Sequence, residues 1–217
     1  LTDKYGIAIN FKQYKNAVVF RCDQNFRKVE ILGHNFYTAP EVAVDSYGNV
    51  WASDREEDAI GAVRLTYVME NGNFGYVDQA TGRSWRIDRT NLESDVAKRH
   101  WHQNDPGVIP NVMEVGTGFP MGMTVYEGKL LPRKYWDQIL VADAGIQALR
   151  GFTLKNEGAG YKADHELVIN GQRDTWFRPS DVCVAPDGSL IMSDWYDPVI
   201  GHHRMKDREK GRLFRIA

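Results

Sequence analysis

The chain has 217 residues, a formal net charge of −2 and 42% hydrophobic residues, which is an ordinary composition for a globular protein. A net charge so close to zero does not indicate that the surface as a whole binds nucleic acid or an acidic membrane. No apolar run approaches the roughly 20 residues that cross a bilayer, and the opening stretch LTDKYGIAIN lacks the basic-then-apolar pattern of a signal sequence. We therefore expect no nucleic-acid partner and no transmembrane segment.

Short apolar runs separated by Gly, Asp, Asn and Pro predict a mostly β chain. In chain order the strands are expected at 17–20, 28–32, 41–44, 49–53, 138–142, 165–169, 189–193 and 212–216. One stretch, 91–101, has a helical pattern, with a cap at Thr90 and Glu93 three residues later. The sequence thus predicts an all-β fold with one or two helical turns.

The two cysteines, Cys22 and Cys183, lie in strand-like runs. Because free cysteine packs as a small hydrophobe, we expect two buried free thiols, although a bridge between them stays open. The chain has no C-x-x-C and no C-x-x-C-H motif. It therefore carries neither a zinc knuckle nor a covalent haem site.

One hairpin pattern recurs along the chain. PEVAVDSYGNVWASD (40–54) and SDVCVAPDGSLIMSD (180–194) match as strand, Gly turn, second strand and terminal Asp, and 122–145 is a weaker copy whose turn has eight extra residues. Such a repeat indicates the blades of a β-propeller, with a β-sandwich as the competing architecture. The count is about three blades, and the first residues resemble the later strands of another blade.

Each repeat ends in an aspartate: Asp54, Asp143 and Asp194. If the repeats are arranged radially, these carboxylates converge on one region and can hold a hard cation such as calcium. The alternative is that each caps the turn that follows it, since Asp bonds backbone N–H groups two residues on. In the loop SDWYDPVIGHHRMKD (193–207), Asp197 is a further calcium candidate beside Asp194, because hard cations prefer oxygen.

Several stretches, among them PEVAVDSYGNVWASD, HWHQNDPGVIPN and SDWYDPVIGHH, resemble one known family. They are similar to the propeller of the membrane-bound dehydrogenase family, which is itself similar to soluble quinoprotein glucose dehydrogenases and sorbosone dehydrogenases. The resemblance implies a six-bladed propeller. Residues 1–217 would be a single propeller domain with the later three to four blades and without the N-terminal ones.

The resemblance also implies chemistry. Relatives bind pyrroloquinoline quinone with calcium beside it and oxidise a sugar or alcohol, while a histidine base on an early blade takes the hydroxyl proton. Larger relatives continue into helical repeats and a cytochrome-type electron acceptor domain. The family implies an extracytoplasmic location, either periplasmic or membrane-associated. The base would lie upstream of Leu1, so no catalytic residue is assigned in this chain.

Four residues are candidates for contact with the cofactor. Arg178 falls where relatives place a cofactor-side arginine, whose guanidinium suits the carboxylates of the quinone; the alternative is a surface arginine stacked on an aromatic ring. His100 and His102 would share a face if they lie on a strand, whereas on a loop they would bond carbonyls. His202 matches a glycine–histidine pair of the family, and its alternative is a neutral ring that holds the loop.

Two functions therefore remain open. The kept motifs DWYDP and HWHQNDPGV favour a quinone-dependent dehydrogenase. Tyr37 and Thr38 stand where relatives usually carry Arg and Asn, which favours a non-catalytic propeller that binds a carbohydrate or a partner protein.

Overall fold

The computed structural model describes residues 2–10, 14, 16–55, 62–84, 94, 100–200 and 210–217. All its described elements are β-strands apart from one short 3-10 helix, η2 (Arg133–Tyr135), which confirms the predicted fold class. The helix expected at 91–101 lies almost entirely outside these residues. In the part of the chain that is described, no helix has the length and apolar character needed to cross a membrane.

Residue contacts divide the chain into two compact units. Unit 1 comprises Leu1–Ala39 and Val68–Asn111, and unit 2 comprises Pro40–Tyr67 and Val112–Ala217. The expectation of a single domain over 1–217 stays a prediction.

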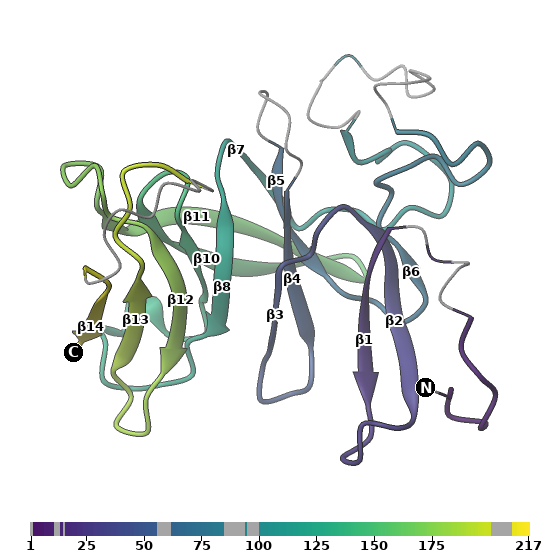
Figure 1. Ribbon diagram of the computed structural model, residues 1–217, viewed down its shortest axis with the longest axis horizontal. Helices are drawn as coiled ribbons and strands as arrows, with labels where there is room; N and C mark the ends of the chain where they lie inside the picture. The colour runs from purple at the N-terminus through teal and green to yellow at the C-terminus, as the bar shows by residue number, and fades with distance from the viewer. Residues whose placement is uncertain are drawn as a thin grey trace. The chain divides into compact units, whose positions relative to one another are not determined.

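Unit 1 contains one three-stranded sheet. Its strands are β1 (Ala17–Cys22), β2 (Val29–Phe36) and β6 (Gly72–Asn73), in the order β1-β2-β6 (Figure 1). Phe36 and Phe74 stack with ring centroids 4.2 Å apart, and both are fully buried. Glycine at position 33 permits this packing, because a Cβ there would lie 2.7 Å from the Phe74 ring.

Unit 2 contains three sheets built from neighbouring strands. The β3–β7 sheet consists of β3 (Glu41–Val44), β4 (Val50–Arg55), β5 (Val63–Tyr67) and β7 (Met113–Gly116). The β8–β11 sheet consists of β8 (Pro120–Val125), β9 (Ile139–Asp143), β10 (Ala148–Glu157) and β11 (Gly160–Asn170). The β12–β14 sheet consists of β12 (Pro179–Val184), β13 (Leu190–Asp194) and β14 (Arg212–Ile216).

The predicted repeat is the first hairpin of each sheet in unit 2. Val44 pairs with Val50 and Val184 pairs with Leu190 across equivalent turns. Gly48 and Gly188 have φ near +86° and +85°, a backbone conformation that favours glycine. In the third copy the extra residues contain η2. The repeat that was read from the sequence is therefore confirmed strand by strand.

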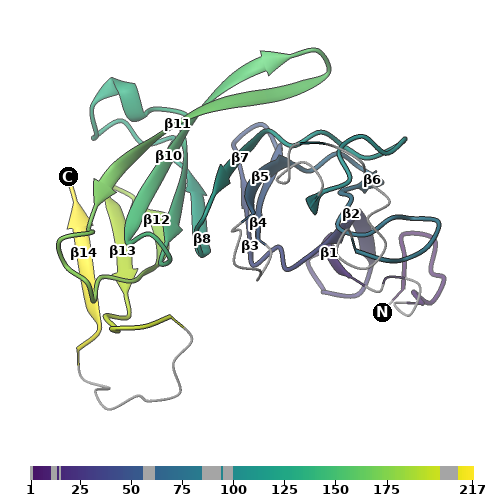
Figure 2. The same cartoon turned by 90° about the horizontal axis from the view of Figure 1, so that it is seen from above.

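The first strands of the three sheets lie side by side. β8 contacts β3 on one side and β12 on the other (Figure 2). One buried cluster, which includes Leu140, Val182 and Met192, lies between the β8–β11 and β12–β14 sheets, and another, which includes Trp51, Leu65 and Val141, lies between the β3–β7 and β8–β11 sheets. Sheets that pack in sequence around their first strands are blades, and this arrangement differs from the two facing layers of a sandwich.

The longest hairpin, β10–β11, extends from its own sheet toward the β3–β7 sheet (Figures 1 and 2). Tyr161, near its tip, packs against two rings of that sheet, with centroids 5.0 Å from Trp51 and 4.9 Å from Tyr67. The hairpin therefore ties two sheets of unit 2 together.

Candidate functional site

The three repeat aspartates form the same ion pair in three sheets. Each comes at or near the end of the second strand of its sheet, and its Oδ2 accepts a hydrogen bond from an arginine on the third strand. The pairs are Asp54 with Arg64 at 2.8 Å, Asp143 with Arg150 at 2.8 Å, and Asp194 with Arg212 at 2.7 Å. All three carboxylates are buried. Burial of a carboxylate is costly unless a cation and hydrogen-bond donors surround it, and each sheet supplies both.

In Asp143 and Asp194 the second oxygen caps the adjoining turn, whereas Asp54 Oδ1 accepts the N–H of the next residue, Arg55. Asp143 Oδ1 accepts N–H groups from Gly145 and Ile146, and also from Phe119, which precedes β8. Asp194 Oδ1 accepts the N–H of Tyr196 in the same way. These bonds confirm the capping role that the sequence offered as an alternative to metal binding.

A calcium role for these residues stays a prediction. Across the described ranges, no group of three or more His, Cys, Asp or Glu side chains is arranged to hold a metal ion. Asp197 is engaged separately: its Oδ1 accepts the N–H of Val199, and its own N–H donates to the carbonyl of Trp176. The cation beside Asp194 in this structure is the guanidinium of Arg212.

Arg178 is a buried cation at the start of β12. Its Nη1 and Nη2 donate to the carbonyls of Phe177 and Pro198, and its Nε has no partner among the residues described. Burial lowers the pKa of this guanidinium below its ordinary value, while nearby carboxylates, Asp197 foremost, oppose that shift. With 8% exposure, the surface position that the sequence allowed is wrong.

Backbone contacts hold Arg178 in place. Its N–H donates to Asp194 Oδ1 at 2.7 Å, so the same carboxylate that pairs with Arg212 also fixes the chain at Arg178. In the described part of the chain Arg178 forms no ion pair of its own, whereas the other buried arginines of unit 2, Arg64 and Arg150, each have a carboxylate. A charged, anchored guanidinium with a spare donor is suited to bind an anionic group.

The histidines of HWHQ belong to unit 1. His100 and His102 are completely buried, and residues 101–104 form a turn, so the strand with a shared histidine face is wrong. His102 Nδ1 lies 2.9 Å from the carbonyl oxygen of Gly75, which confirms the carbonyl-bonding alternative for this residue. His202 lies outside the described residues. Contact of any of the three with a cofactor stays a prediction.

The cysteines differ from expectation in one respect. Both are free, as predicted, but both are exposed. Side chains alternate along a strand, so Cys183 points away from the core that its neighbour Val182 enters. Cys22 is the last residue of β1, where the strand leaves the core.

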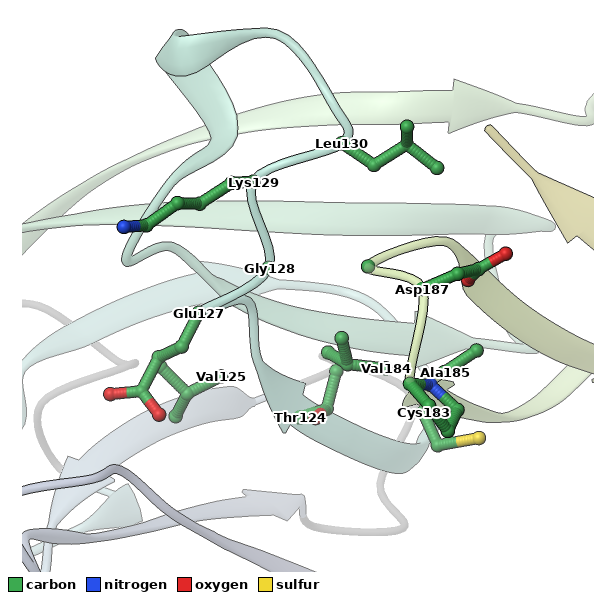
Figure 3. Close-up of a pocket in the computed structure, with 12 residues that line it drawn as sticks. Thr124, Val125, Glu127, Gly128, Lys129, Leu130, Cys183, Val184, Ala185 and Asp187 are labelled. Carbon is green, nitrogen blue, oxygen red and sulfur yellow. The ribbon is translucent and has the colours of Figure 1, made fainter.

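A pocket of about 780 Å³ in unit 2 lies between the hairpin turns that follow β8 and β12 (Figure 3). It is lined by Thr124, Val125 and residues in the ranges 127–130 and 183–188. Tyr126 joins the two turns by donating to the carbonyl of Gly188 at 2.7 Å. Arg178 precedes β12, whereas the pocket adjoins its far end, and a six-residue strand is about 20 Å long. This pocket is therefore not the space beside Arg178.

One protein-family model matches nearly the whole chain. A domain of unknown function (DUF7133) matches residues 7–217. The chain belongs to the DUF7133 family. No curated protein matches this DUF7133 chain.

Solved structures show the fold of the DUF7133 chain to be that of propeller dehydrogenases. A glucose dehydrogenase-type oxidoreductase from Thermus thermophilus aligns with a TM-score of 0.59 at 19% identity, over 86% of this chain and 47% of that one. The soluble aldose sugar dehydrogenase from Escherichia coli, in its apo-form, aligns with a TM-score of 0.58 at 14% identity, over 98% and 52%. The PQQ-bound aldose sugar dehydrogenase from Streptomyces coelicolor aligns with a TM-score of 0.57 at 15% identity, over 90% and 47%. The DUF7133 chain thus has the predicted β-propeller fold and spans about half the length of these structures.

Proposed function

We propose that the chain forms part of a propeller dehydrogenase that oxidises a sugar or an alcohol with a pyrroloquinoline quinone-type cofactor and calcium. The fold is like that of sugar dehydrogenases, one of which was solved with the quinone bound. Likeness of fold alone does not carry an activity. The observation that carries the proposal is Arg178, a buried guanidinium that forms no ion pair within the described ranges.

The residues around Arg178 fit an anionic cofactor. The quinone has three carboxylates, and a guanidinium with one unused donor can bind one of them through charge-assisted hydrogen bonds. Asp194 orients the arginine through its backbone, and the carbonyls of Phe177 and Pro198 orient its side chain. The bound quinone would accept the hydride from the alcohol carbon; the chain's own part in this proposal is to bind and orient.

Calcium belongs to the proposal only together with the quinone. Asp54, Asp143 and Asp194 each have an arginine partner, and the described residues contain no carboxylate group that is arranged for a metal. Asp197 has one carboxylate oxygen bonded to a backbone N–H, so its other oxygen is the nearest candidate ligand in this loop. We therefore expect calcium to bind measurably only when the quinone supplies ligands as well.

The test is a titration of the intact protein with pyrroloquinoline quinone, calcium, and both, followed by melting temperature and by dye reduction with sugars. We expect the quinone to raise the melting temperature, by an amount that corresponds to about 2.7 kcal/mol at a concentration of 100 times Kd, and calcium to add to this only in its presence. Arg178→Lys keeps the charge but loses the planar fork, so it should weaken quinone binding.

Arg215→Met is the matched control, because Arg215 is an exposed arginine at the other end of the β12–β14 sheet. It should bind quinone as the wild type does. If the quinone changes neither the melting temperature nor dye reduction, the dehydrogenase proposal is wrong and the non-catalytic propeller is favoured. A cytochrome-type electron acceptor and an extracytoplasmic location belong to the same proposal and fail with it.

A further inference from the structure

A second pocket, in unit 1, has the size and lining of a small-molecule site. It has a volume of about 380 Å³, and its lining includes Tyr14, Asn16, His34, Asn35 and Gln79. Small-molecule sites range over roughly 300–1,000 Å³. None of these residues belongs to the quinone proposal, whose candidate Arg178 lies in unit 2.

The inner wall of this pocket is fixed by buried asparagines. Asn35 has a positive φ of 67°, and its amide exchanges two hydrogen bonds with the backbone of Val77, at 2.9 and 3.1 Å. It also donates to Asn73 Oδ1 at 2.7 Å and accepts from Asn16 Nδ2 at 2.9 Å. Because every bond of this network is made within unit 1, the wall is organised before any ligand arrives.

The rim of the pocket keeps hydrogen-bonding groups that are unused. Within the described residues, the Tyr14 hydroxyl, both ring nitrogens of His34 and the amide nitrogen of Gln79 make no hydrogen bond; Gln79 uses only its oxygen, which accepts from Asn73. Burial lowers the pKa of His34 below its ordinary 6.5, so the ring is neutral at pH 7 and offers one donor and one acceptor. The rim thus presents mixed donors and acceptors beside an aromatic ring.

The charge of the pocket restricts its ligand. Asp78 is its one charged residue among those described, and a backbone N–H of Thr81 bonds this carboxylate. With no lysine or arginine in the described lining, an anionic ligand would be repelled, and one carboxylate is too few to hold a metal ion. Hydroxyl groups suit neutral amide, imidazole and phenol partners.

We propose that this pocket of unit 1 binds a neutral polyhydroxylated ligand, either a sugar or a sugar alcohol. The hydroxyls of the ligand would bond His34, Gln79 and Asn16, and its C–H face would pack on the ring of Tyr14. The inference does not rest on the quinone proposal, because sugar binding here is measured without any quinone.

The experiment is saturation-transfer NMR on the intact protein without quinone, with D-glucose, D-sorbitol and D-gluconate as probes. We expect signals from glucose or sorbitol and none from the anionic gluconate. The stronger binder of the two neutral probes shows whether the ligand is a sugar or a sugar alcohol. Gln79→Ala and Tyr14→Ala should each weaken binding about fivefold, as expected for loss of one hydrogen bond or one ring contact. Gln172→Ala, at an exposed glutamine of unit 2, is the matched control and should leave binding unchanged.

Three results would overturn the inference: neither neutral probe binds, gluconate binds as well as they do, or both unit 1 variants bind like the wild type. Gln79 is exposed, so its substitution does not put folding at risk. Arg178→Lys should leave glucose and sorbitol binding intact. Loss of quinone binding in Arg178→Lys tests the quinone proposal, and loss of sugar binding in the Gln79 and Tyr14 variants tests this one. Failure of one proposal can therefore be distinguished from failure of the other.

Discussion

A fully buried carboxylate is stable only when its charge and both of its oxygens are satisfied, and Asp143 shows how this chain achieves it. One oxygen binds Arg150 at 2.8 Å, and the other accepts backbone N–H groups, including that of Phe119 at 2.7 Å. Arg150 is itself buried and donates a further bond to the carbonyl of Thr117. The pair therefore joins the second strand of its sheet, the third strand and the segment that enters the first.

Removal of the cation from this pair should be strongly destabilising. We expect Arg150→Leu to lower the free energy of unfolding by about 3–5 kcal/mol, because it leaves Asp143 buried without a partner charge. Arg212→Leu should cost less, since the side chain of Arg212 is 33% exposed and solvent on its side screens the interaction with the buried Asp194. Urea unfolding of both variants measures the difference, and equal losses would contradict this account.

At the residue scale the sequence predicted the aspartates but not their partners. The aspartates recur at a fixed place in a repeated hairpin, which is visible in one dimension. The arginines lie 10, 7 and 18 residues further on, because the loops between second and third strands differ in length. The arginines could have been predicted as the basic residue on the strand that follows each aspartate. That prediction requires the third strand of each sheet to be recognised first. Arg178 was found by resemblance, whereas its burial follows from packing that no local pattern encodes.

At the scale of elements, close approach between sheets depends on particular glycines. Gly122 lies on β8 where β12 passes it, and a Cβ at this position would stand 2.1 Å from Asp181 Oδ1 and 2.5 Å from Asp181 Cα. The second contact is with backbone, so a side-chain rotation cannot relieve it. A larger residue at position 122 must push the two first strands apart.

We therefore expect Gly122→Ala to destabilise unit 2 by about 1–3 kcal/mol, the usual cost of overpacking. Gly160→Ala is the control, because a Cβ there would meet only one backbone atom, at 3.9 Å. The measurement is the urea midpoint of each variant. A Gly122→Ala protein as stable as the Gly160→Ala protein would show that β8 and β12 are not closely packed.

Strands that consist of a short apolar run between turn residues were predicted well, even where few of their side chains are buried, as in β3 and β14. The strands at 41–44, 189–193 and 212–216 match β3, β13 and β14 within a residue. Of β10 and β11, only 165–169 was predicted, although the two strands pair from Ala148–Asn170 to Glu157–Gly160. Their outer halves are mostly polar, and only Leu154, Tyr161 and Ala163 pack against the core cluster, so no continuous apolar run marks these strands in the sequence.

At the scale of the whole molecule, contacts between sheets of unit 2 depend partly on this exposed hairpin. Tyr161 is the aromatic residue of its tip, and it meets Trp51 and Tyr67 at angles of 66° and 76°, close to the edge-to-face geometry that aromatic rings favour. The β3–β7 sheet thus contacts the β8–β11 sheet both through its first strand and through Trp51 and Tyr67.

Tyr161→Ala should lower stability by about 1–3 kcal/mol, since two aromatic contacts of about 0.5–1.5 kcal/mol each are lost. We expect amide hydrogen exchange to accelerate most in β4 and β5 and least in the β12–β14 sheet. Tyr161→Phe keeps the ring and should behave like the wild type. Uniform acceleration over all three sheets would argue against a local tie.

The propeller arrangement was predictable because a hairpin that repeats with its terminal aspartate leaves few alternatives, and the solved structures bear it out. The site was predictable only in part. Where a side chain such as Arg178 or His102 is buried, and which carbonyl it meets, depends on segments that are distant in sequence.

Because each of the three repeat aspartates finds its counter-ion within its own blade, the buried charge of one blade is neutralised without help from the next. A blade of this kind can lengthen its outer loops, or acquire new ones, without exposing a buried charge elsewhere. Such self-sufficiency leaves the loops free to diverge while the scaffold beneath them is kept.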